Sequence, residues 1–413
     1  MKPNLFLITS DFPFGKGEAS FIMPELPALK ERFDITVISN SLESVQTVFL
    51  DEDVQIVHYD RKASLPRKLW DSICYFSSRD AWQELKEIVC SRKKIIRRFM
   101  ESILFFEEAR RFERFLKKNH VIDEKEPAIV YSYWFTYYCL TMTRLFGENP
   151  NIKIVTRTHR YDLYDDGYLG GRQPFKKQMD KKIDSVVFIA EHGRQYYLDK
   201  YCDGVCTGKY QLFRLGVIPK GKDEKKNVDK FNQFLLVSCS VIIPRKRVDL
   251  IIEALSQIND LNIKWIHFGD GANYERTMEY AKQKLANLAN ISYEFMGYAE
   301  TEQIMDFYGK NTVNAFITTT ESEGCPVSVQ EAMAYGIPII GTNVAEIPYM
   351  IKENGILLSA DPSPEEVSSA IRHLYGLPRE EIVLMREKSY QLWKENFDGT
   401  VNAGKFADFL FHM

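Results

Sequence analysis

Short apolar runs alternate with helical patterns along the whole chain, and this alternation occurs twice. In the first half the apolar runs begin at Leu5, Ile35, Ile129, Ile152 and Ser185. In the second half they begin at Phe234, Lys264, Ser292, Ala315 and Ile339. Strands separated by helices are typical of a parallel sheet, because each parallel connection must cross back over the sheet. We therefore predict an α/β protein with two halves, each a parallel sheet covered by helices.

A charged tract with few apolar residues, 220–230, separates the two halves. The sequence predicts a first domain at 1–218, which opens with a strand, a loop, one amphipathic helix over 18–32 and a second strand. It predicts a second domain at 219–395. The last segment, 396–413, has a helical pattern and lies beyond the second sheet, so we expect it to pack back on the first domain. A chain of 413 residues is long enough for both domains to bury their own cores.

Charge and cysteine usage exclude several partners. Lys and Arg total 54 against 57 Asp and Glu, so the net charge of −3 provides no attraction to nucleic acid. The seven cysteines include no C-x-x-C pair and no histidine at zinc spacing, which predicts free thiols in a reducing cytosol. No apolar run approaches the roughly 20 residues that span a bilayer, and no signal peptide is recognisable. We expect a cytoplasmic protein, free or bound at the inner face of the membrane, with no metal and no cofactor.

Residues 61–118 depart from the alternation and carry excess positive charge. They contain 16 Lys or Arg against 8 Asp or Glu, with apolar residues at helical spacing beside Arg97, Arg98, Arg110 and Arg111. One interpretation is a pair of solvated amphipathic helices inserted in the first domain. The other is a surface for an anionic membrane or a phosphorylated lipid acceptor, to which each basic residue adds up to about 1 kcal/mol.

The most informative stretch is T-T-T-E-S-E-G-C-P-V-S-V-Q-E-A-M-A-Y-G-I-P at 318–338. A strand ends near Thr319, a glycine loop follows, and a helix is predicted from Val327 to Tyr335. This order places free backbone N–H groups and the positive helix end at the carboxyl edge of the sheet, where phosphates bind. The predicted anion-binding segment comprises Gly324, Cys325, Pro326, Val327 and Ser328, and Gly324 permits close approach of a ligand.

Two roles are open for Glu331, which lies one turn inside this helix. Its carboxylate can accept hydrogen bonds from two vicinal hydroxyl groups, such as those of a ribose. Alternatively, Ser328 and Glu331 form a capping box, in which Glu331 only bonds a backbone N–H. Glu323, in the preceding loop, is either a ligand contact or a solvated side chain.

These residues resemble the signature of glycosyltransferase family 4, whose members are retaining enzymes with the GT-B fold. Glu323 and Glu331 match the two glutamates of the signature, which are separated by seven residues and followed by A-M-A-x-G-x-P. The resemblance continues through G-D-G at 269–271, M-G-Y at 296–298, Glu346 and E-N-G-I-L-L at 353–358. It implies two facing Rossmann-like domains with a cleft between them and a C-terminal helix that crosses back.

The resemblance also implies a nucleotide-sugar donor and assigns residues to it. Glu323 is expected to contact the sugar and Glu331 the ribose. The base is expected on backbone groups near Gly271, Gly297 and Tyr298.

The loop P-R-K-R at 244–247 provides positive charge for such a donor. Because no metal-binding constellation is visible, cations and N–H groups must stabilise the departing diphosphate. One cation about 4 Å away supplies roughly 4 kcal/mol at an effective dielectric constant of 20. Lys246 matches the family's diphosphate-binding lysine, although a surface cationic turn is the alternative. The family's arginine about six residues earlier is replaced by Ser240 or Val241, and Arg245 or Arg247 is expected to substitute.

Two loops of the first domain complete the predicted site. Gly15 and Gly17 follow the first strand, where the family has a glycine loop; a plain turn explains the pair equally well. His159, in T-R-T-H-R-Y-D at 156–162, resembles the family histidine that faces the transferred sugar. Asp162 is a second candidate, either for an acceptor contact or for a helix N-cap.

The sequence thus predicts a hexosyltransferase that acts with retention in cell-surface polysaccharide biosynthesis. The donor is a UDP-sugar, or a GDP-sugar as the less favoured choice, and the acceptor is a saccharide or a lipid-linked saccharide. Lys246, Glu323 and His159 are the predicted catalytic residues, and no protein nucleophile is expected. The alternatives are a non-catalytic nucleotide-sugar-binding subunit, which the missing arginine favours, and another GT-B enzyme such as a sugar epimerase.

Overall fold

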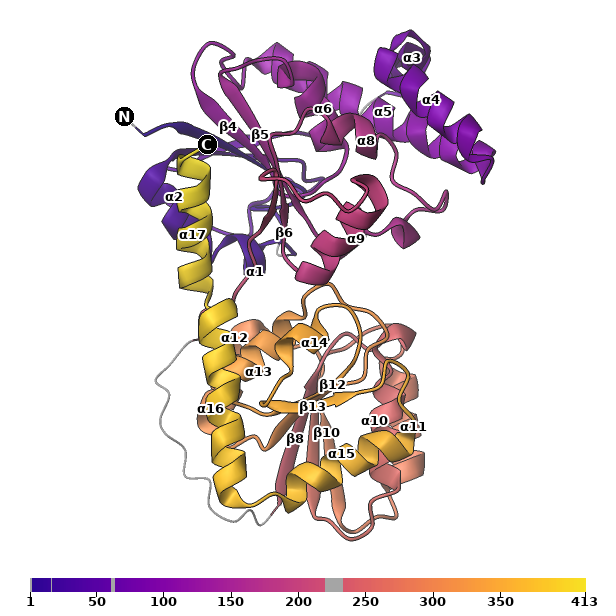
Figure 1. The fold of residues 1–413 in the computed structure, drawn as a ribbon, viewed down its shortest axis with the longest axis vertical. Coiled ribbons are helices and arrows are strands. Elements are labelled where there is room, and N and C mark those ends of the chain that lie inside the picture. The colour runs from indigo at the N-terminus through magenta and orange to yellow at the C-terminus, as the bar shows by residue number, and fades with distance from the viewer. Residues whose placement is uncertain (1, 16, 61–63, 220–232) are drawn as a thin grey trace. The chain divides into compact units, whose positions relative to one another are not determined.

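The computed structural model describes residues 2–15, 17–60, 64–219 and 233–413, which form two compact units (Figure 1). Unit 1 comprises Met1–Arg214 with Ala403–Met413, and unit 2 comprises Leu215–Asn402. The two units divide after residues 214 and 402, whereas the sequence predicted boundaries after 218 and 395. The predicted boundary tract, 220–230, lies outside the described residues.

Unit 1 is built on a seven-stranded parallel sheet in the order β3-β2-β1-β4-β5-β6-β7. Its strands are β1 (Asn4–Thr9), β2 (Asp34–Ser39), β3 (Gln55–His58), β4 (Ala128–Ser132), β5 (Ile152–Thr158), β6 (Ser185–Phe188) and β7 (Tyr210–Leu212). Its helices are α1 (Ala19–Ile22), α2 (Leu26–Arg32), α3 (Leu65–Cys74), α4 (Arg79–Ser91), α5 (Ile95–Asn119), α6 (Tyr137–Phe146), α7 (Arg160–Leu163), α8 (Lys176–Asp180) and α9 (Glu191–Tyr201). The C-terminal part of α17 (Gly399–Phe411) joins them.

Two apolar cores cover the two faces of this sheet, because successive side chains of a strand point to opposite faces. Leu5 and Leu7 of β1 pack in one core, with α1, α2 and the residues of α17 that include Phe406. Phe6 and Ile8 pack in the other, with α5, α6, α8 and α9. The last helix of the chain is therefore part of the core of unit 1.

Two helical predictions for unit 1 are wrong. The single helix expected over 18–32 is divided into α1 and α2, because Pro24 has no N–H with which to continue α1. The described part of the insertion, 64–118, holds α3, α4 and nearly all of α5, so the interpretation of this insertion as a pair of helices is wrong. None of the helices in the described part of the chain has the length and apolar character needed to cross a bilayer.

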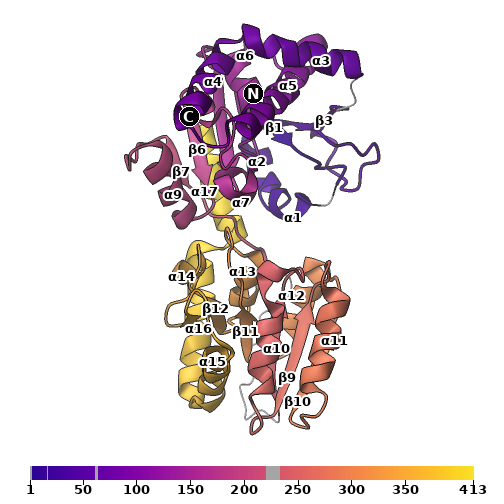
Figure 2. The same cartoon turned by 90° about the vertical axis from the view of Figure 1, so that its right-hand side faces the viewer.

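Unit 2 has a six-stranded parallel sheet in the order β10-β9-β8-β11-β12-β13. Its strands are β8 (Phe234–Cys239), β9 (Ile263–Phe268), β10 (Ile291–Phe295), β11 (Ala315–Thr318), β12 (Ile339–Thr342) and β13 (Gly355–Leu358). Its helices are α10 (Val248–Ser256), α11 (Tyr274–Leu285), α12 (Thr301–Lys310), α13 (Val327–Ala334), α14 (Ile347–Met350), α15 (Pro364–Gly376) and α16 (Arg379–Asn396). Helices α10, α11 and α15 cover one face, and α12, α13 and α16 lie on the other (Figure 2).

Each sheet has one position at which the strand order changes direction. In unit 1 it lies between β1 and β4, and in unit 2 it lies between β8 and β11. At such a switch point the connections leave toward opposite faces, so the loops at the carboxyl ends of the two strands diverge and leave room for a ligand. The loops after β1, β4, β8 and β11 are therefore the expected positions of a ligand site.

Candidate functional site

In unit 2 the loop after β8 is bonded to the loop after β11. The backbone N–H of Glu321 donates to the carbonyl of Arg245 at 2.9 Å. The hydroxyl of Thr319 donates to the carbonyl of Arg247, also at 2.9 Å. These bonds fix the P-R-K-R turn, a 3₁₀ turn over Pro244–Lys246, against the segment that leads into α13. Two stretches more than 70 residues apart in the sequence thus form one surface at the switch point.

An ion pair between Lys246 and Glu323 lies at the centre of this surface. The ammonium group of Lys246 donates to Oε1 of Glu323, and the side chains are 14% and 12% exposed. Both charges are therefore close enough to solvent to be reached by a ligand and are still partly desolvated. The structure brings together the two residues of unit 2 that the sequence singled out for catalysis.

The two arginines of the turn have different roles. The guanidinium of Arg247 donates to the carbonyls of Thr319, at 2.6 Å, and Ala360, at 3.1 Å, and pairs with Asp361. Its hydrogen bonds are therefore used to hold three segments of unit 2 together. Arg245 donates through Nη1 to the carbonyl of Ser322. Of the two proposed substitutes for the missing arginine, Arg245 is the one with fewer internal bonds.

Helix α13 begins as predicted at Val327, and Pro326 is its N-cap. The capping-box prediction for Ser328 and Glu331 is wrong, because Ser328 lies inside the helix and no side chain caps it. Glu331 is instead 3% exposed. Burial raises its pKa to about 8, and a hydrogen bond with Thr301 offsets part of this effect. A carboxyl group buried without a cation beside it is poised to gain a ligand partner.

The loops after β9 and β10 lie at the same carboxyl edge of the unit 2 sheet, where glycines allow their backbones to come close together. The N–H of Gly269 donates to the carbonyl of Gly297 at 2.8 Å, and the N–H of Ile242 donates to the carbonyl of Asp270 at 2.6 Å. Gly271 has a φ of +143°, and a Cβ there would lie 2.7 Å from the carbonyl oxygen of Ile242. These contacts keep backbone groups close together near Tyr298, whose side chain is 66% exposed.

In unit 1, His159 lies at the end of β5 against two aromatic rings. Its ring centroid is 4.9 Å from that of Tyr133 and 4.4 Å from that of Trp134. The residue is 8% exposed, and neither ring nitrogen has a partner among the described residues. Burial, with a contribution from Arg157, lowers its pKa to about 3, so the imidazole is neutral. Two unpartnered buried nitrogens are costly unless a ligand satisfies them.

Asp162 is not available for an acceptor. It is fully buried, and its carboxylate accepts hydrogen bonds from the backbone N–H groups of Phe135, at 2.7 Å, and His159, at 2.6 Å. It occupies the third position of α7, so the N-cap prediction is also wrong. Its role is to hold the backbone of His159 in place.

Glu18, which was not predicted as a site residue, organises the glycine loop after β1. Its carboxylate accepts from the backbone N–H groups of Ser10, at 3.0 Å, Asp11, at 2.7 Å, and Phe12, at 2.9 Å. It also accepts from the indole N–H of Trp134. The ring of Trp134 in turn contacts His159, so the loops after β1, β4 and β5 meet at the switch point of unit 1. The only signal in the sequence for this role of Glu18 is that it directly follows the G-x-G at 15–17.

Gly15 and Gly17 lie against Asp11 in that loop. A Cβ on Gly15 would lie 2.2 Å from Oδ2 of Asp11, and one on Gly17 would lie 3.3 Å from it. Burial and the neighbouring Glu18 raise the pKa of Asp11 to about 7. No group of three His, Cys, Asp or Glu side chains that could bind a metal occurs among the residues described in either unit.

With this geometry in place, comparisons with known proteins identify the second half. Residues 220–391 match the model of the family described as glycosyl transferases group 1. All the predicted site residues of unit 2 lie within this matched segment.

Two relatives match parts of the chain. A protein of Streptococcus agalactiae named UDP-N-acetylglucosamine–peptide N-acetylglucosaminyltransferase GtfA subunit is 26% identical over 37% of this chain and 31% of its own length. The putative teichuronic acid biosynthesis glycosyltransferase TuaC of Bacillus subtilis is 24% identical over 65% of this chain and 65% of its own. The matches thus span less than two thirds of either relative.

A solved structure extends the likeness in fold to the whole chain. HepE from Anabaena, solved in complex with UDP and glucose, covers 100% of both chains with a TM-score of 0.65 at 12% identity. The chain therefore has the GT-B fold, which confirms the fold class expected from the sequence. The resemblance to glycosyltransferases rests on the family model that matches residues 220–391.

Proposed function

We propose that this protein transfers a hexose-type sugar from a UDP-sugar, or alternatively a GDP-sugar, to a saccharide or lipid-linked saccharide with retention. The observation that carries the proposal is the Lys246–Glu323 ion pair at the β8–β11 switch point, beside the start of α13. It puts a cation, a carboxylate and free helical N–H groups where a nucleotide diphosphate binds in open α/β sheets. The UDP in the name of the Streptococcus relative and in the HepE complex supports a uridine donor.

The residues of unit 2 divide the donor between them in this proposal. Lys246, Arg245 and the N–H groups of Val327 and Ser328 stabilise the negative charge of the diphosphate as it leaves. Glu331 accepts hydrogen bonds from the ribose hydroxyls. Glu323, released from Lys246 when the diphosphate takes over that cation, contacts the sugar. The base lies on the backbone near Gly271, Gly297 and Tyr298.

Transfer with retention requires no protein nucleophile in this scheme. The bond between the anomeric carbon and the diphosphate oxygen breaks, and the acceptor oxygen bonds to the anomeric carbon on the same face. The acceptor proton passes to the departing phosphate oxygen. His159, which is neutral and whose ring nitrogens have no partner among the described residues, hydrogen-bonds the sugar. Gly15 and Gly17, which lie against Asp11 in the β1 loop, contact the donor.

A non-catalytic nucleotide-sugar-binding subunit is the second candidate. It is favoured by the absence of an arginine at Ser240 and Val241 and by the internal use of Arg247. In that case the donor binds to the same unit 2 surface and no sugar is transferred.

Both candidates are proposed to work in the cytosol, the second as a partner of another enzyme. All seven cysteines are free thiols, and Cys90 and Cys206 are exposed, which suits a reducing compartment. We further propose that the acceptor belongs to cell-surface polysaccharide assembly, which the name of the Bacillus relative supports.

Titration calorimetry with UDP, GDP and ADP, followed by mass spectrometry of a donor and acceptor panel, tests the proposal. We expect UDP to bind, Lys246→Gln to weaken binding roughly 100-fold, and the exposed Lys282→Gln to leave it unchanged. We expect His159→Ala to abolish transfer while UDP still binds. UDP binding with no product from any pair would favour the second candidate, and no binding of any nucleotide would overturn both.

A further inference from the structure

Helix α3 presents its apolar stripe to solvent and its acidic residue to the protein. Leu65, Leu69 and Ile73, at intervals of four, are 70%, 57% and 60% exposed, and Trp70 beside them is 63% exposed. The one residue of the helix that is buried is Asp71, which pairs with Arg114 of α5. A surface helix normally packs its apolar stripe on the core and turns its charges to water. The reversed arrangement indicates that something apolar covers α3.

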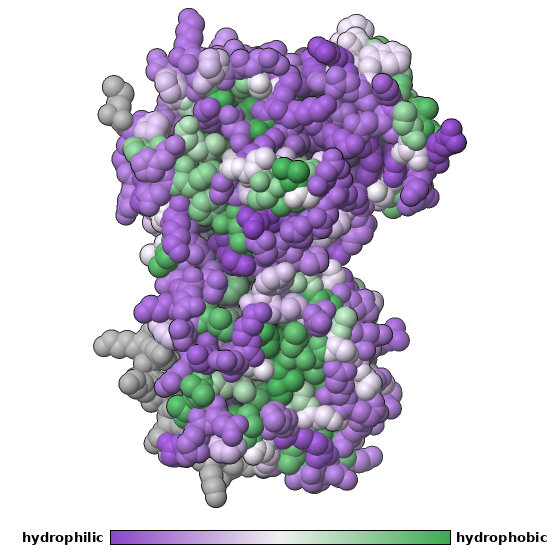
Figure 3. Space-filling model, viewed as in Figure 1, coloured by the Kyte–Doolittle hydropathy of each residue, from purple (hydrophilic) through white to green (hydrophobic). Residues whose placement is uncertain are grey.

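The apolar surface continues onto the neighbouring helices. Among the described residues, eleven of the twenty-nine exposed large hydrophobic ones lie within 65–104, and they include two of the five tryptophans. Beyond α3 they are Phe76, then Trp82 and Val89 of α4, and Ile95, Ile96, Met100 and Leu104 of α5. Pale and green side chains gather among purple ones over the end of unit 1 that carries α3 and α4 (Figure 3). Such a concentration marks an interaction surface.

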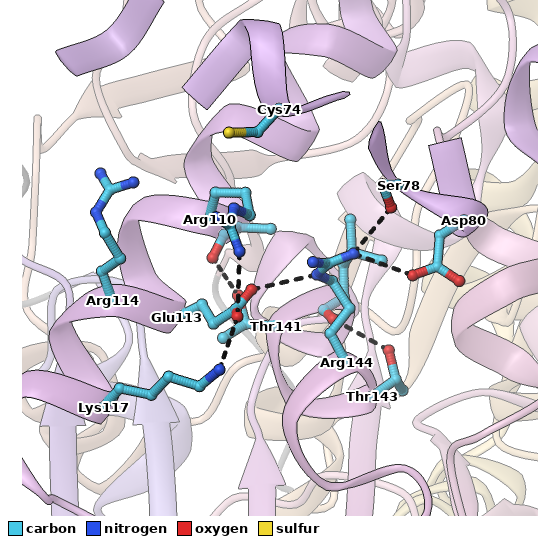
Figure 4. A network of polar contacts seen from close by, with 12 residues as sticks. Cys74, Ser78, Asp80, Arg110, Glu113, Arg114, Lys117, Thr141, Thr143 and Arg144 are labelled. Carbon is cyan, nitrogen blue, oxygen red and sulfur yellow. Dashed lines mark hydrogen bonds and ion pairs between the residues drawn. The ribbon is translucent and has the colours of Figure 1, made fainter. Parts of the chain in front are cut away.

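Most acidic side chains of these helices form ion pairs within unit 1. Glu113 of α5 pairs with Arg110, Lys117 and Arg144, and Arg144 also bonds Asp80 of α4 (Figure 4). Glu84 of α4 pairs with Arg172, and Glu107 of α5 pairs with Arg111. The expectation that Arg110 and Arg111 contribute to an exposed basic patch is therefore wrong, because both are used internally.

A different set of cations faces outward beside the apolar side chains. Seven basic residues of α3, α4, the α4–α5 connection and the start of α5 are exposed and form no ion pair with any described residue: Arg67, Lys68, Arg79, Lys86, Arg92, Lys93 and Arg97. The outward charge of this surface is thus almost wholly positive. It combines indole rings, aliphatic side chains and basic groups, as helices do that lie in the headgroup region of a bilayer.

We propose that α3, α4 and the first three turns of α5 form a docking surface for a bilayer containing anionic lipids. The apolar side chains enter the acyl boundary, and the seven cations lie among headgroup phosphates. A second copy of this chain fits less well, because a two-fold interface would bring like charges together. The inference concerns binding to a membrane only and does not depend on the proposed glycosyl transfer.

Vesicle co-sedimentation of the full chain tests the proposal with two variants, each compared with its own control. The apolar variant, called the apolar pair, carries Leu69→Ser and Ile73→Ser. Its control carries Leu384→Ser and Val401→Ser, at exposed positions of unit 2. The cationic triple is Arg92→Gln, Lys93→Gln and Arg97→Gln, against the control Lys282→Gln, Lys394→Gln and Lys405→Gln. All these side chains are exposed, so the variants should fold.

We expect the protein to bind vesicles of phosphatidylcholine with phosphatidylglycerol, and to bind pure phosphatidylcholine far more weakly. The cationic triple should lower the partition coefficient roughly 100-fold, the equivalent of about 1 kcal/mol for each charge. The apolar pair should lower it at least tenfold, and 0.5 M salt should weaken wild-type binding by ~tenfold or more. Binding should shift the fluorescence of Trp70 and Trp82 to the blue, which Trp70→Phe with Trp82→Phe should remove.

Three outcomes would overturn the proposal. The first is the absence of binding to either vesicle by the wild-type chain. The second is equal binding by each variant and its control. The third is a concentration-dependent dimer that the apolar pair disrupts while vesicle binding is absent, which would make a second copy the partner of this surface.

Discussion

The guanidinium carbon of Arg157 lies 4.3 Å from the centroid of the Phe406 ring, so the last helix of the chain covers a fully buried charge of β5. Arg157 also pairs with Glu25, which precedes α2. The sheet, the α1–α2 segment and α17 therefore meet at one cation. Its burial is tolerable because the carboxylate and the aromatic ring replace part of the lost hydration.

Removal of the Phe406 ring should weaken unit 1. Phe406 is 1% exposed, so Phe406→Ala should lower the free energy of unfolding of unit 1 by about 3–5 kcal/mol, from the cavity and the lost ring contact. Phe411→Ala, at a 49% exposed position of the same helix, should cost about 1 kcal/mol or less. Hydrogen exchange of peptides from β1 and β5 measures both. Equal effects of the two variants would contradict the role assigned to Phe406.

The Lys246–Glu323 pair should be detectable as a coupling in stability. Lys246→Met and Glu323→Gln should each destabilise unit 2 by about 1–3 kcal/mol, because each leaves a partly buried charge without its partner. The double variant should be more stable than the sum of the single effects predicts. Urea unfolding of the wild type, the two single variants and the double variant, all without nucleotide, measures this coupling as a double-mutant cycle. Additive effects would mean that the two side chains do not interact in solution.

UDP affinity should depend on pH through Glu331. Its pKa is raised to about 8, so in the protein without ligand the Glu331 carboxyl group is protonated at pH 7. Two ribose hydroxyls that donate hydrogen bonds to it require the ionised carboxylate. Binding then releases a proton, so the Kd should fall with rising pH by up to about tenfold per unit, and level off above pH 8.

Calorimetry between pH 6.5 and 9 measures this dependence, with Glu331→Gln as the control. The variant should bind more weakly at high pH and lose the trend. Any slope that it retains belongs to UDP, whose terminal phosphate titrates near pH 6. An identical slope in both proteins would remove Glu331 from the ribose site.

Gly271→Ala should destabilise unit 2, whereas Gly376→Ala should stabilise it. The φ of +143° and the carbonyl of Ile242 at 2.7 Å leave no room for a Cβ, so we expect a loss of about 3 kcal/mol or more and weaker nucleotide binding. Gly376→Ala is the control, because nothing lies within 4 Å of its added Cβ at the end of α15. It should stabilise the protein by about 0.4–1 kcal/mol. Thermal unfolding distinguishes the two.

The sequence was sufficient to predict the fold and the loops of unit 2, because those features are local. Alternating apolar runs specify parallel strands, and the residues from Glu323 to Glu331 lie on one loop and one helix. The pairing of Lys246 with Glu323 was not predicted, because it depends on β8 and β11 being neighbours at the switch point. The site roles of these residues stay predictions.

The residues that organise unit 1 could not be predicted in this way. Glu18 meets Trp134 across 116 positions, and Arg157 meets Glu25 across 132. No periodicity relates partners so far apart; only the folded sheet brings them together. The orientation of α3 was equally hidden, because an amphipathic pattern reports that a helix has an apolar face but not which way that face points.

The contribution of 403–413 to the core of unit 1 has a consequence for biosynthesis. A ribosome releases β1 some 400 residues before Phe406, and until Phe406 emerges the face of the sheet that holds Leu5 and Leu7 has α1 and α2 on it but not α17. The first half of this protein therefore matures only after the second half has been translated. During that interval the part of the sheet face that α17 will cover is a natural substrate for chaperones.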